Sequence, residues 1–418
     1  MGRWIGGGTP SKSHAAYWQG DIPWVSPKDM KVERVLDATD HISESAVDET
    51  ATSLVPDGSV LVVTRSGILS HTLPVAVADR AVALNQDLKA LVPARGLDPT
   101  YIAWALRAHA QRILATCSKS GTTVSNIETR RLLGFAVPLA PFAEQRRIVA
   151  AIEEQFSRLD AVDEILVTVQ LRAEALRRAT LNSHLSVISE SRPLDDFATT
   201  QLGKMLSSKA RTGTDPRPYL RNKNVRWYEF ELDGLLEMDF DENERAKFAL
   251  EPGDVVVCEG GEVGRAAVWR GEMEECYFQK AVHRVRTQDD LAPDFLVHVL
   301  RWFADTNAFE RYITGSTINH LPQEDLRTLP IPAPPVEEQQ RIVAEIEQQL
   351  SLINSLRAAV ESAQKRNASL RRSILERAFR GELVPQDPED EPASVLLERI
   401  RAERAAAPKP TRRRRVPA

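Results

Sequence analysis

Two stretches of the chain, residues 142–182 and 336–381, place apolar residues at alternating steps of three and four positions. This spacing lines the apolar side chains along one side of a helix, and because it runs for about five heptads it predicts a coiled coil. Polar residues at such a seam can fix the register, and here they are Gln155, Gln349 and Asn367. The alternative is two amphipathic helices of an ordinary core. The apolar seam positions are Ile148, Ile152, Leu159, Val162, Leu166, Val169, Ala173 and Leu176 in the first stretch, and Ile342, Ile346, Ile353, Leu356, Val360, Ala363, Leu370 and Ile374 in the second.

The two stretches belong to an internal repeat with a constant offset of 194 residues. Residues 141–155 and 335–349 are identical at ten of fifteen positions, and the same offset relates Gly121–Val124 to Gly315–Ile318. A gapless offset over such a length indicates a duplicated unit, in which a globular part is followed by a long helix. Because each helix must lead from one globular part back towards the other, we expect the two helices to pair antiparallel.

The globular parts mix short strands with helices. Residues 57–64 and 252–258 each read as a turn followed by a buried strand, and residues 99–106 and 293–300 read as helices with proline at the start. The fold class predicted is mixed α/β, with two α/β domains joined by two long antiparallel coiled-coil helices in a pseudo-twofold repeat. The expected boundaries are 1–140 and 186–334 for the two domains, 141–185 and 335–384 for the helices, and 385–418 for a partly disordered tail.

Composition narrows the class of protein. No run approaches 18 apolar residues, so no membrane span is expected, and the N-terminus lacks the pattern of a signal peptide. The three cysteines have neither zinc-site nor disulfide spacing, which favours a reducing, cytoplasmic location. The net charge of −5 argues at first against nucleic-acid binding. Net charge, however, averages over surfaces with different roles, and residues 1–140 alone carry 14 Lys and Arg against 13 Asp and Glu.

Motifs of common enzymes are absent from the sequence. It contains no phosphate-binding Gly-x-x-x-x-Gly-Lys loop, no Gly-x-Ser-x-Gly elbow and no His-Glu-x-x-His helix. The nuclease-like spacing Asp254…Glu259-Gly-Gly261 has glycine where a lysine beside the attacking water is needed. We therefore expect no catalytic residue, no metal and no cofactor.

Local charge is more informative than net charge. From residue 204 to 226 the chain carries seven Lys and Arg against one Asp, interleaved with hydroxyl, amide and aromatic side chains that suit phosphate and base contacts. A solvated loop is the alternative. The candidates here are Lys204, Ser207, Ser208, Lys209, Arg211, Tyr219, Arg221, Asn222, Lys223, Asn224 and Arg226.

The first copy and the loops before the long helices supply further candidates. The small hydroxyls of residues 120–123 and 314–317 suit either a phosphate contact or the cap of a following turn, and residues 260–265 suit either a hairpin or a DNA-facing loop. These candidates are Thr9, Ser11, Lys12, Trp24, Ser26, Lys28, Lys119, Ser120, Thr122, Thr123, Arg265, Thr314, Ser316 and Thr317.

Several of these segments together resemble the specificity subunits of type I restriction–modification systems. The resemblance covers nearly the whole chain. Its most specific part is the doubled proline-Glu-Gln-x-Arg-Ile-Val pattern. The matching segments are residues 7–12, 21–26, 121–123, 138–149, 315–317, 330–343 and 373–383.

The resemblance implies two target-recognition domains, each of which reads half of an interrupted double-stranded DNA sequence. The paired helices would act as a ruler and as the docking site for two modification (methyltransferase) subunits, while ATP-dependent restriction subunits would complete the complex. One departure is that the second copy's lead-in, residues 192–197, would fall mostly before Met1 in the first copy. The first domain is therefore expected to lack its opening element, through a truncated copy or a mis-assigned start.

Two other classes of function compete with this interpretation. A coiled-coil assembly scaffold without direct DNA reading explains the helices but not the duplicated hydroxyl-rich loops or the basic run. A free-standing DNA enzyme lacks the motifs that it would need.

Overall fold

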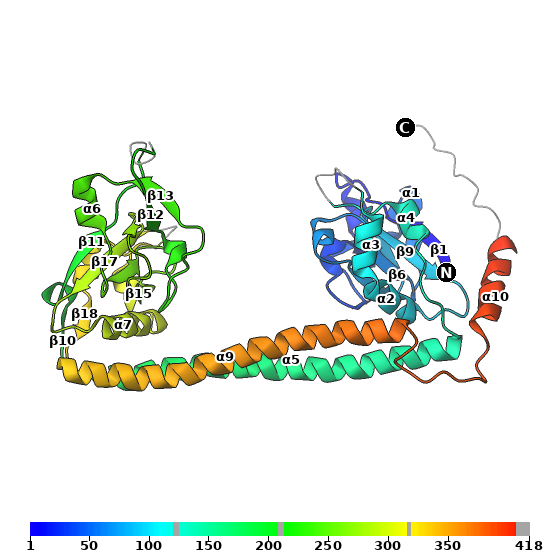
Figure 1. Ribbon diagram of the computed structural model, residues 1–418. Coiled ribbons are helices and arrows are strands. Elements are labelled where there is room, and N and C mark those ends of the chain that lie inside the picture. Colours follow the sequence, from blue (N-terminus) through cyan, green and yellow to red (C-terminus); the bar gives the residue numbers. More distant parts are fainter. Residues whose placement is uncertain (120–124, 208–212, 316–318, 407–418) are drawn as a thin grey trace. The chain divides into compact units, whose positions relative to one another are not determined.

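The computed structural model describes residues 1–119, 125–207, 213–315 and 319–406 (Figure 1). The chain forms two compact units. Unit 1 contains Met1–Glu164 and the described residues from Gln364 onward, and unit 2 contains Ile165–Ala363. Both long helices therefore contribute to both units.

Unit 1 is built on two small sheets with helices beside them. Strand β6 is preceded by a turn in which Gly58 adopts φ of +70°, and all four of its residues are buried, as is typical of a strand covered on both faces. The larger sheet has the order β1 (Gly2–Gly6), β9 (Leu88–Pro93), β6 (Val60–Val63), β7 (Val75–Ala78) and β3 (Arg34–Val35). The smaller sheet has the order β4 (Asp40–Ile42), β2 (Ile22–Val25), β8 (Val82–Leu84) and β5 (Leu54–Val55). The helices are α1 (Glu44–Glu49), α2 (Pro99–Ala108), α3 (Ala110–Cys117) and α4 (Thr129–Leu133).

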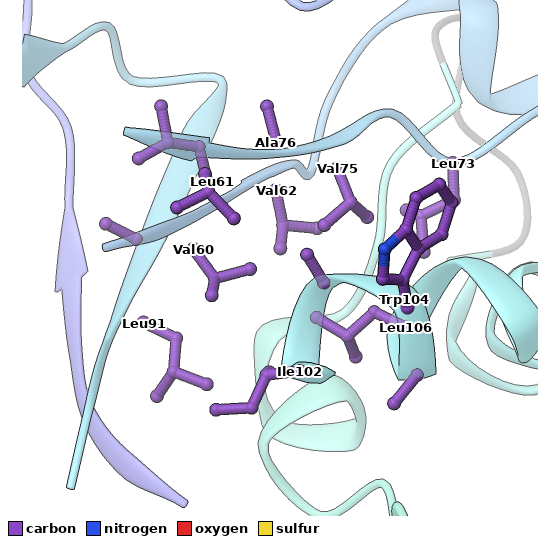
Figure 2. Close-up of a cluster of buried hydrophobic side chains, with 14 of the residues drawn as sticks. Val60, Leu61, Val62, Leu73, Val75, Ala76, Leu91, Ile102, Trp104 and Leu106 are labelled. Carbon is purple, nitrogen blue, oxygen red and sulfur yellow. The ribbon is translucent and has the colours of Figure 1, made fainter. Parts of the chain in front are cut away.

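The core of unit 1 lies between the larger sheet and α2. Figure 2 shows Ile102, Trp104 and Leu106 of α2 beside apolar side chains of the strands. Asp98 caps this helix by accepting hydrogen bonds from the backbone N–H groups of Thr100 (2.8 Å) and Tyr101 (3.0 Å). The strand predicted at 57–64 and the helix predicted at 99–106 are thereby confirmed.

Unit 2 repeats this plan with one addition. Strands β11, β14 and β17 pair as β1, β6 and β9 do, and helix α7 follows them as α2 does. The added pair, β10 (Ser191–Pro193) with β18 (Pro330–Pro332), includes part of the lead-in seen in the sequence of the second copy. The remaining strands are β11 (Ala198–Leu202), β12 (Pro216–Leu220), β13 (Leu236–Asp239), β14 (Val255–Cys258), β15 (Ala266–Val268), β16 (Tyr277–Phe278) and β17 (Val282–Thr287). The helices are α6 (Glu242–Phe248), α7 (Pro293–Asp305) and α8 (Gln323–Arg327).

The long helices α5 (Phe142–Leu185) and α9 (Val336–Phe379) pack antiparallel, as predicted. In unit 1, Asn367 is buried at the seam and its amide donates to the carbonyl oxygen of Leu159 (2.9 Å) and to Asp163 (2.5 Å). In unit 2, the Thr180 hydroxyl donates to Gln349 (2.8 Å). These polar contacts fix the register of the two helices.

Part of the predicted seam is wrong. Val162, Leu176, Leu356 and Leu370 were assigned to it but are between 42% and 55% exposed. A straight helix drifts by about 20° per heptad relative to a 3.5-residue repeat, so a strict heptad count moves off the buried face. Near Leu176 the neighbouring Arg177 turns inward instead.

The C-terminal tail contains a helix that the sequence did not suggest. Helix α10 (Ala393–Ala406) buries Leu396 and Ile400 in the core of unit 1. Leu396 packs against Gly96, where a Cβ atom would approach its Cδ1 to 2.8 Å. Arg147 on α5 also forms a bidentate ion pair with Asp390, just before α10 (2.6 and 3.4 Å). Within the described residues, the tail is therefore largely ordered on unit 1.

The described part of the chain has no helix with both the length and the apolar character that crossing a membrane requires. Cys117, Cys258 and Cys276 are buried and unpaired with one another. Burial raises the pKa of Cys258 to about 11 and that of Cys276 to about 12, so both remain protonated thiols at neutral pH.

Candidate nucleic-acid interface

In unit 1 the loop that follows β1 lies against the connection between β8 and β9. The backbone N–H groups of Gly7 and Gly8 donate to the carbonyl oxygens of Leu88 (3.4 Å) and Leu84 (2.8 Å). A Cβ atom at Gly7 would lie 1.8 Å from the carbonyl oxygen of Asn85, so only glycine fits there. This contact places residues 9–12 at one end of the larger sheet.

Two more segments meet at the same end of unit 1. Arg65, which follows β6, forms a β-bridge with Asn126, and its N–H donates to the carbonyl oxygen of Asp87 (3.2 Å). The N–H of Ser66 donates to the carbonyl oxygen of Ser125 (3.1 Å). The loops after β1, after β6, before β9 and before α4 thus converge in one cluster.

Unit 2 assembles the equivalent four loops in the same way. Gly203, after β11, lies against the segment before β17, where a Cβ atom would approach the carbonyl oxygen of Gln279 to 2.3 Å. After β14, the backbone carbonyl oxygen of Glu259 accepts from the N–H of Leu321 (2.7 Å), and Gly260 forms a β-bridge with His320. Arg65 and Gly260 each follow their strand, β6 or β14, by two residues, and each forms the bridge to the segment before the last short helix. Their partners, Asn126 and His320, are related by the 194-residue offset, so the cluster is a duplicated feature.

A fifth segment joins the cluster in unit 2. The Asn222 amide donates to the carbonyl oxygen of Gly260 (3.0 Å), which brings residues 221–226 beside the loop after β14. The structure therefore brings together residues 221–226 of the basic run and residues 260–265, two segments that are well separated in the sequence.

The candidate side chains fall into four groups by exposure. The exposed ones are Thr9, Ser11, Lys12, Lys28, Lys119, Ser207, Lys223, Arg226 and Thr314. The partly exposed ones are Lys204, Arg221, Asn222 and Arg265. The buried ones are Trp24, Ser26, Tyr219 and Asn224. Ser120, Thr122, Thr123, Ser208, Lys209, Arg211, Ser316 and Thr317 lie outside the described residues.

The four buried candidates have structural roles and are not available to a DNA duplex in this conformation. The Trp24 indole N–H donates to the carbonyl oxygen of Gly8 (3.0 Å), and Ser26 caps a short helix together with Asp29. Tyr219 lies in an apolar cluster. Asn224 accepts from the N–H of Arg221 (3.1 Å) and so shapes the turn of the basic run. At these positions the aromatic and amide side chains pack and form hydrogen bonds within the protein.

Two partly exposed cations are already engaged in unit 2. Lys204 donates to Glu244 (2.5 Å) and to the carbonyl oxygen of Asp239 (2.6 Å). Arg265 donates to Glu262 (3.1 Å) and to the carbonyl oxygen of Asn222 (2.7 Å), which makes it a brace between two loops.

The structure adds cations that the sequence did not single out. Arg65 in unit 1 and Lys280 in unit 2 are exposed within the two loop clusters. Lys280, Lys204 and Lys247 line a groove of about 390 Å³ beside Gly203. Lys247 and Lys280 lie outside the basic run of residues 204–226, so their position beside Lys204 follows only from the fold.

The described residues contain no cluster of His, Cys, Asp and Glu able to hold a metal ion. Burial lowers the pKa of His283 and of His298 to about 4, so both are neutral at pH 7. The geometry suits binding by exposed cations and polar loops.

The glutamine of the doubled motif joins each globular part to the start of a long helix. In unit 1, Gln145 accepts from the N–H of Asp98 (2.9 Å) and donates to the carbonyl oxygen of Ala140 (2.9 Å). In unit 2, Gln339 accepts from the N–H of Ala292 (2.9 Å) and donates to the carbonyl oxygens of Asp290 and Pro334 (both 2.9 Å). Both side chains are fully buried, so this motif is a structural clamp.

Replacing Gln339 by alanine is expected to lower the free energy of unfolding of unit 2 by about 2–4 kcal/mol, because one N–H and two carbonyl groups lose their partner in the interior. Urea denaturation measures the change. Gln348→Ala, at an exposed position of the same helix, is the control and should change stability by less than about 0.5 kcal/mol. Equal effects of the two substitutions would contradict the clamp.

Comparisons with known proteins agree with the duplicated architecture. A family described as "Type I restriction modification DNA specificity domain" matches residues 2–169 and again 188–362. The type I restriction enzyme EcoR124I/EcoR124II specificity subunit of Escherichia coli is 39% identical over 155 residues, which span 37% of this chain and 38% of that protein. The StySPI specificity subunit of Salmonella potsdam is 25% identical over 349 residues, 76% of this chain and 74% of that protein.

A solved structure from work on complex assembly and conformational transition of the type I R-M system shares the fold. Its chain superimposes with a TM-score of 0.73 at 19% identity, over 91% of this chain and 98% of that one. The fold class predicted from the sequence, mixed α/β with two domains and two paired long helices, is confirmed.

Proposed function

Because the chain belongs to the family of type I restriction–modification DNA specificity proteins, we propose that it is the DNA-recognition subunit of such a complex. Each unit contributes one target-recognition domain, residues 1–140 and 186–334, which reads one half of an interrupted double-stranded DNA sequence. The helical segments 141–185 and 335–384 set the spacing of the half-sites. The observation that carries the proposal is the duplicated loop cluster at equivalent ends of the two larger sheets.

The loop clusters offer the two kinds of contact that DNA reading needs. Exposed cations such as Lys12, Lys119 and Lys223 supply phosphate contacts, which position a protein on the duplex. Exposed hydroxyl groups, among them those of Ser207 and Thr314, supply hydrogen bonds to base edges. A scaffold that never touches DNA gives no reason for such loops to recur at the same place in both units.

The long helices carry an apolar surface that suits partner subunits. Leu352 and Leu356 on α9 are 70% and 43% exposed, and side chains four residues apart lie on one face of a helix. Val162 on α5 is the repeat equivalent of Leu356, and Leu176 is the equivalent of Leu370. Leu352 corresponds to Arg158, so the duplication is limited to these two pairs of exposed apolar positions. Such a duplication suits two modification subunits, which would supply the methyltransferase chemistry. ATP-dependent restriction subunits would add the nuclease activity, and this chain itself is non-catalytic.

Retardation of DNA in a gel, with purified modification subunits present, tests the proposal. The complex is expected to retard a duplex that carries the bipartite site far more strongly than one with either half scrambled. A scaffold predicts no sequence-specific retardation that depends on this chain.

Lys119→Ala combined with Lys223→Ala is expected to weaken binding to all sequences similarly. It should also reduce the slope of log affinity against log salt concentration by about 2, because each lysine neutralises one phosphate. Lys365→Ala, at an exposed position of α9, is the control and should leave the slope unchanged. An unchanged slope in the double variant would remove these two lysines from the interface.

A further inference from the structure

A buried ion pair joins helix α5 to the globular part of unit 2. The guanidinium of Arg177 donates to both carboxylate oxygens of Asp305, at the end of α7, with distances of 2.6 and 2.9 Å. The two side chains are only 5% and 7% exposed. Bidentate geometry fixes the relative orientation of the two groups as well as their separation.

The pair is tied to the second long helix as well. Glu174 accepts from Nε of Arg177 (3.2 Å) and also pairs with Arg357 of α9. Both helices are therefore linked through charges to Asp305.

Further contacts connect the Arg177–Asp305 pair to the loop cluster of unit 2. Arg301, one turn earlier on α7, contacts Asp305 (3.3 Å), and its guanidinium lies over the indole of Trp227, 4.7 Å from the ring centroid. The indole N–H of Trp227 donates to Glu262 (2.5 Å), in the loop after β14.

Glu262 completes the connection to the basic run. It also accepts from Arg265 (3.1 Å), and Arg265 donates to the carbonyl oxygen of Asn222 (2.7 Å). A series of polar contacts therefore runs from the long helices, through the end of α7, to the two loops that carry the candidate DNA contacts of unit 2.

The repeat equivalents of these residues in unit 1 make different contacts. The offset of 194 relates Arg177, Asp305 and Arg301 to Arg371, Gln111 and Arg107. Arg371 pairs with Asp160 and Asp163 on α5, and Arg107 pairs with Glu33. Gln111 is exposed.

Aromatic side chains join the globular part of unit 1 to the long helices. Trp104 packs against Phe156 of α5, and Tyr101 packs against Phe379 of α9, with ring centroids 5.0 and 5.3 Å apart. Apolar contacts of this kind hold two elements together but constrain their orientation less than a bidentate ion pair does.

Buried ion pairs contribute little net stability, because desolvation offsets their attraction, yet they can specify one geometry. We propose that Arg177 and Asp305 are positioning residues for DNA recognition: they fix the orientation of the second recognition domain on the helices and thereby make the complex strict about the spacing between half-sites. This inference rests on the proposed function and adds two residues that touch no DNA.

The test is Asp305→Asn in the full chain, assembled with modification subunits and measured against duplexes whose spacer is native, one base pair longer or one shorter. The ratio of affinities for native and altered spacers is expected to fall by roughly tenfold, while discrimination between bases in the first half-site stays unchanged. Asp305→Glu keeps the charge and should give an intermediate ratio, and it serves as the readout if the asparagine variant does not fold.

Asp254→Asn is the matched control. It removes the bidentate pair of the buried Asp254 carboxylate, just before β14, with Arg286 of β17 in the same unit (2.7 and 2.9 Å). This substitution should lower stability without relaxing the spacer ratio. Unchanged ratios in both Asp305 variants, or equal relaxation by Asp254→Asn, would overturn the inference. Failure of the wild-type complex to bind the bipartite duplex would instead overturn the proposed function.

Discussion

Replacement of both Leu352 and Leu356 by aspartate is expected to weaken assembly with modification subunits by more than about 100-fold. Burial of two leucines contributes about 3–6 kcal/mol to an interface, and two uncompensated carboxylates add a desolvation penalty. The two side chains are exposed on α9 in this chain alone, so its own fold should survive the change. Size-exclusion chromatography of the mixed subunits measures the loss.

The matched control introduces the same two charges elsewhere on α9. Ser362→Asp with Ser369→Asp, at exposed positions away from the apolar face, should leave assembly within about twofold of wild type. If the control variant dissociates as readily as the leucine variant, the effect is one of charge or helix stability. The docking surface would then lie elsewhere.

Insertion of seven residues into both α5 and α9 is expected to lengthen the spacer of the recognised sequence without changing the bases read. Seven residues add about 10.5 Å of helix, close to the rise of three base pairs, and a whole heptad preserves the seam. Three base pairs also turn the duplex by about 100°, since a turn takes 10–10.5 base pairs, so affinity should fall even as the preferred spacer grows. Selection from a library of duplexes with varied spacers gives the preferred length.

The same insertion in α5 alone is the control, because it breaks the pairing of Asn367 and Gln349 with the opposite helix and should abolish bipartite binding. A change in the bases selected by the doubly extended chain would contradict the role of the helices as a spacer.

Much of the fold was predictable because it depends on local pattern. The heptads predict both long helices and place the polar Asn367 at their seam. In each globular part, a turn before the strand and a proline at the start of the helix predict these two elements. The exposure of Leu176 and Leu356 was not predictable, because it depends on which face of each helix the globular parts and the other helix cover. Helix α10 was missed because the arginine-rich end of the tail obscured two apolar positions, Leu396 and Ile400, that bury against unit 1.

The candidate site was predicted only as a region. The sequence indicates the basic run and residues 260–265 as candidates, and the fold brings their described residues into the loop cluster of unit 2. Individual roles depended on tertiary contacts: Tyr219 and Trp24 are buried, Lys204 is held by Glu244, and Lys280 comes from a segment with no distinctive pattern. A residue's exposure at such a site is decided by partners that lie far away in the sequence.

The proposed function requires that one chain reads two DNA half-sites with two separable domains. Methylated adenines are to be sequenced in cells that carry the modification subunits, with either this chain or a hybrid whose residues 186–334 come from a relative of different specificity. We expect an interrupted motif that depends on the chain, and a hybrid motif in which one half changes while the other half and the spacer length are retained. Loss or alteration of both halves in the hybrid, or a methylation pattern that does not depend on this chain, would rule out two separable reading domains.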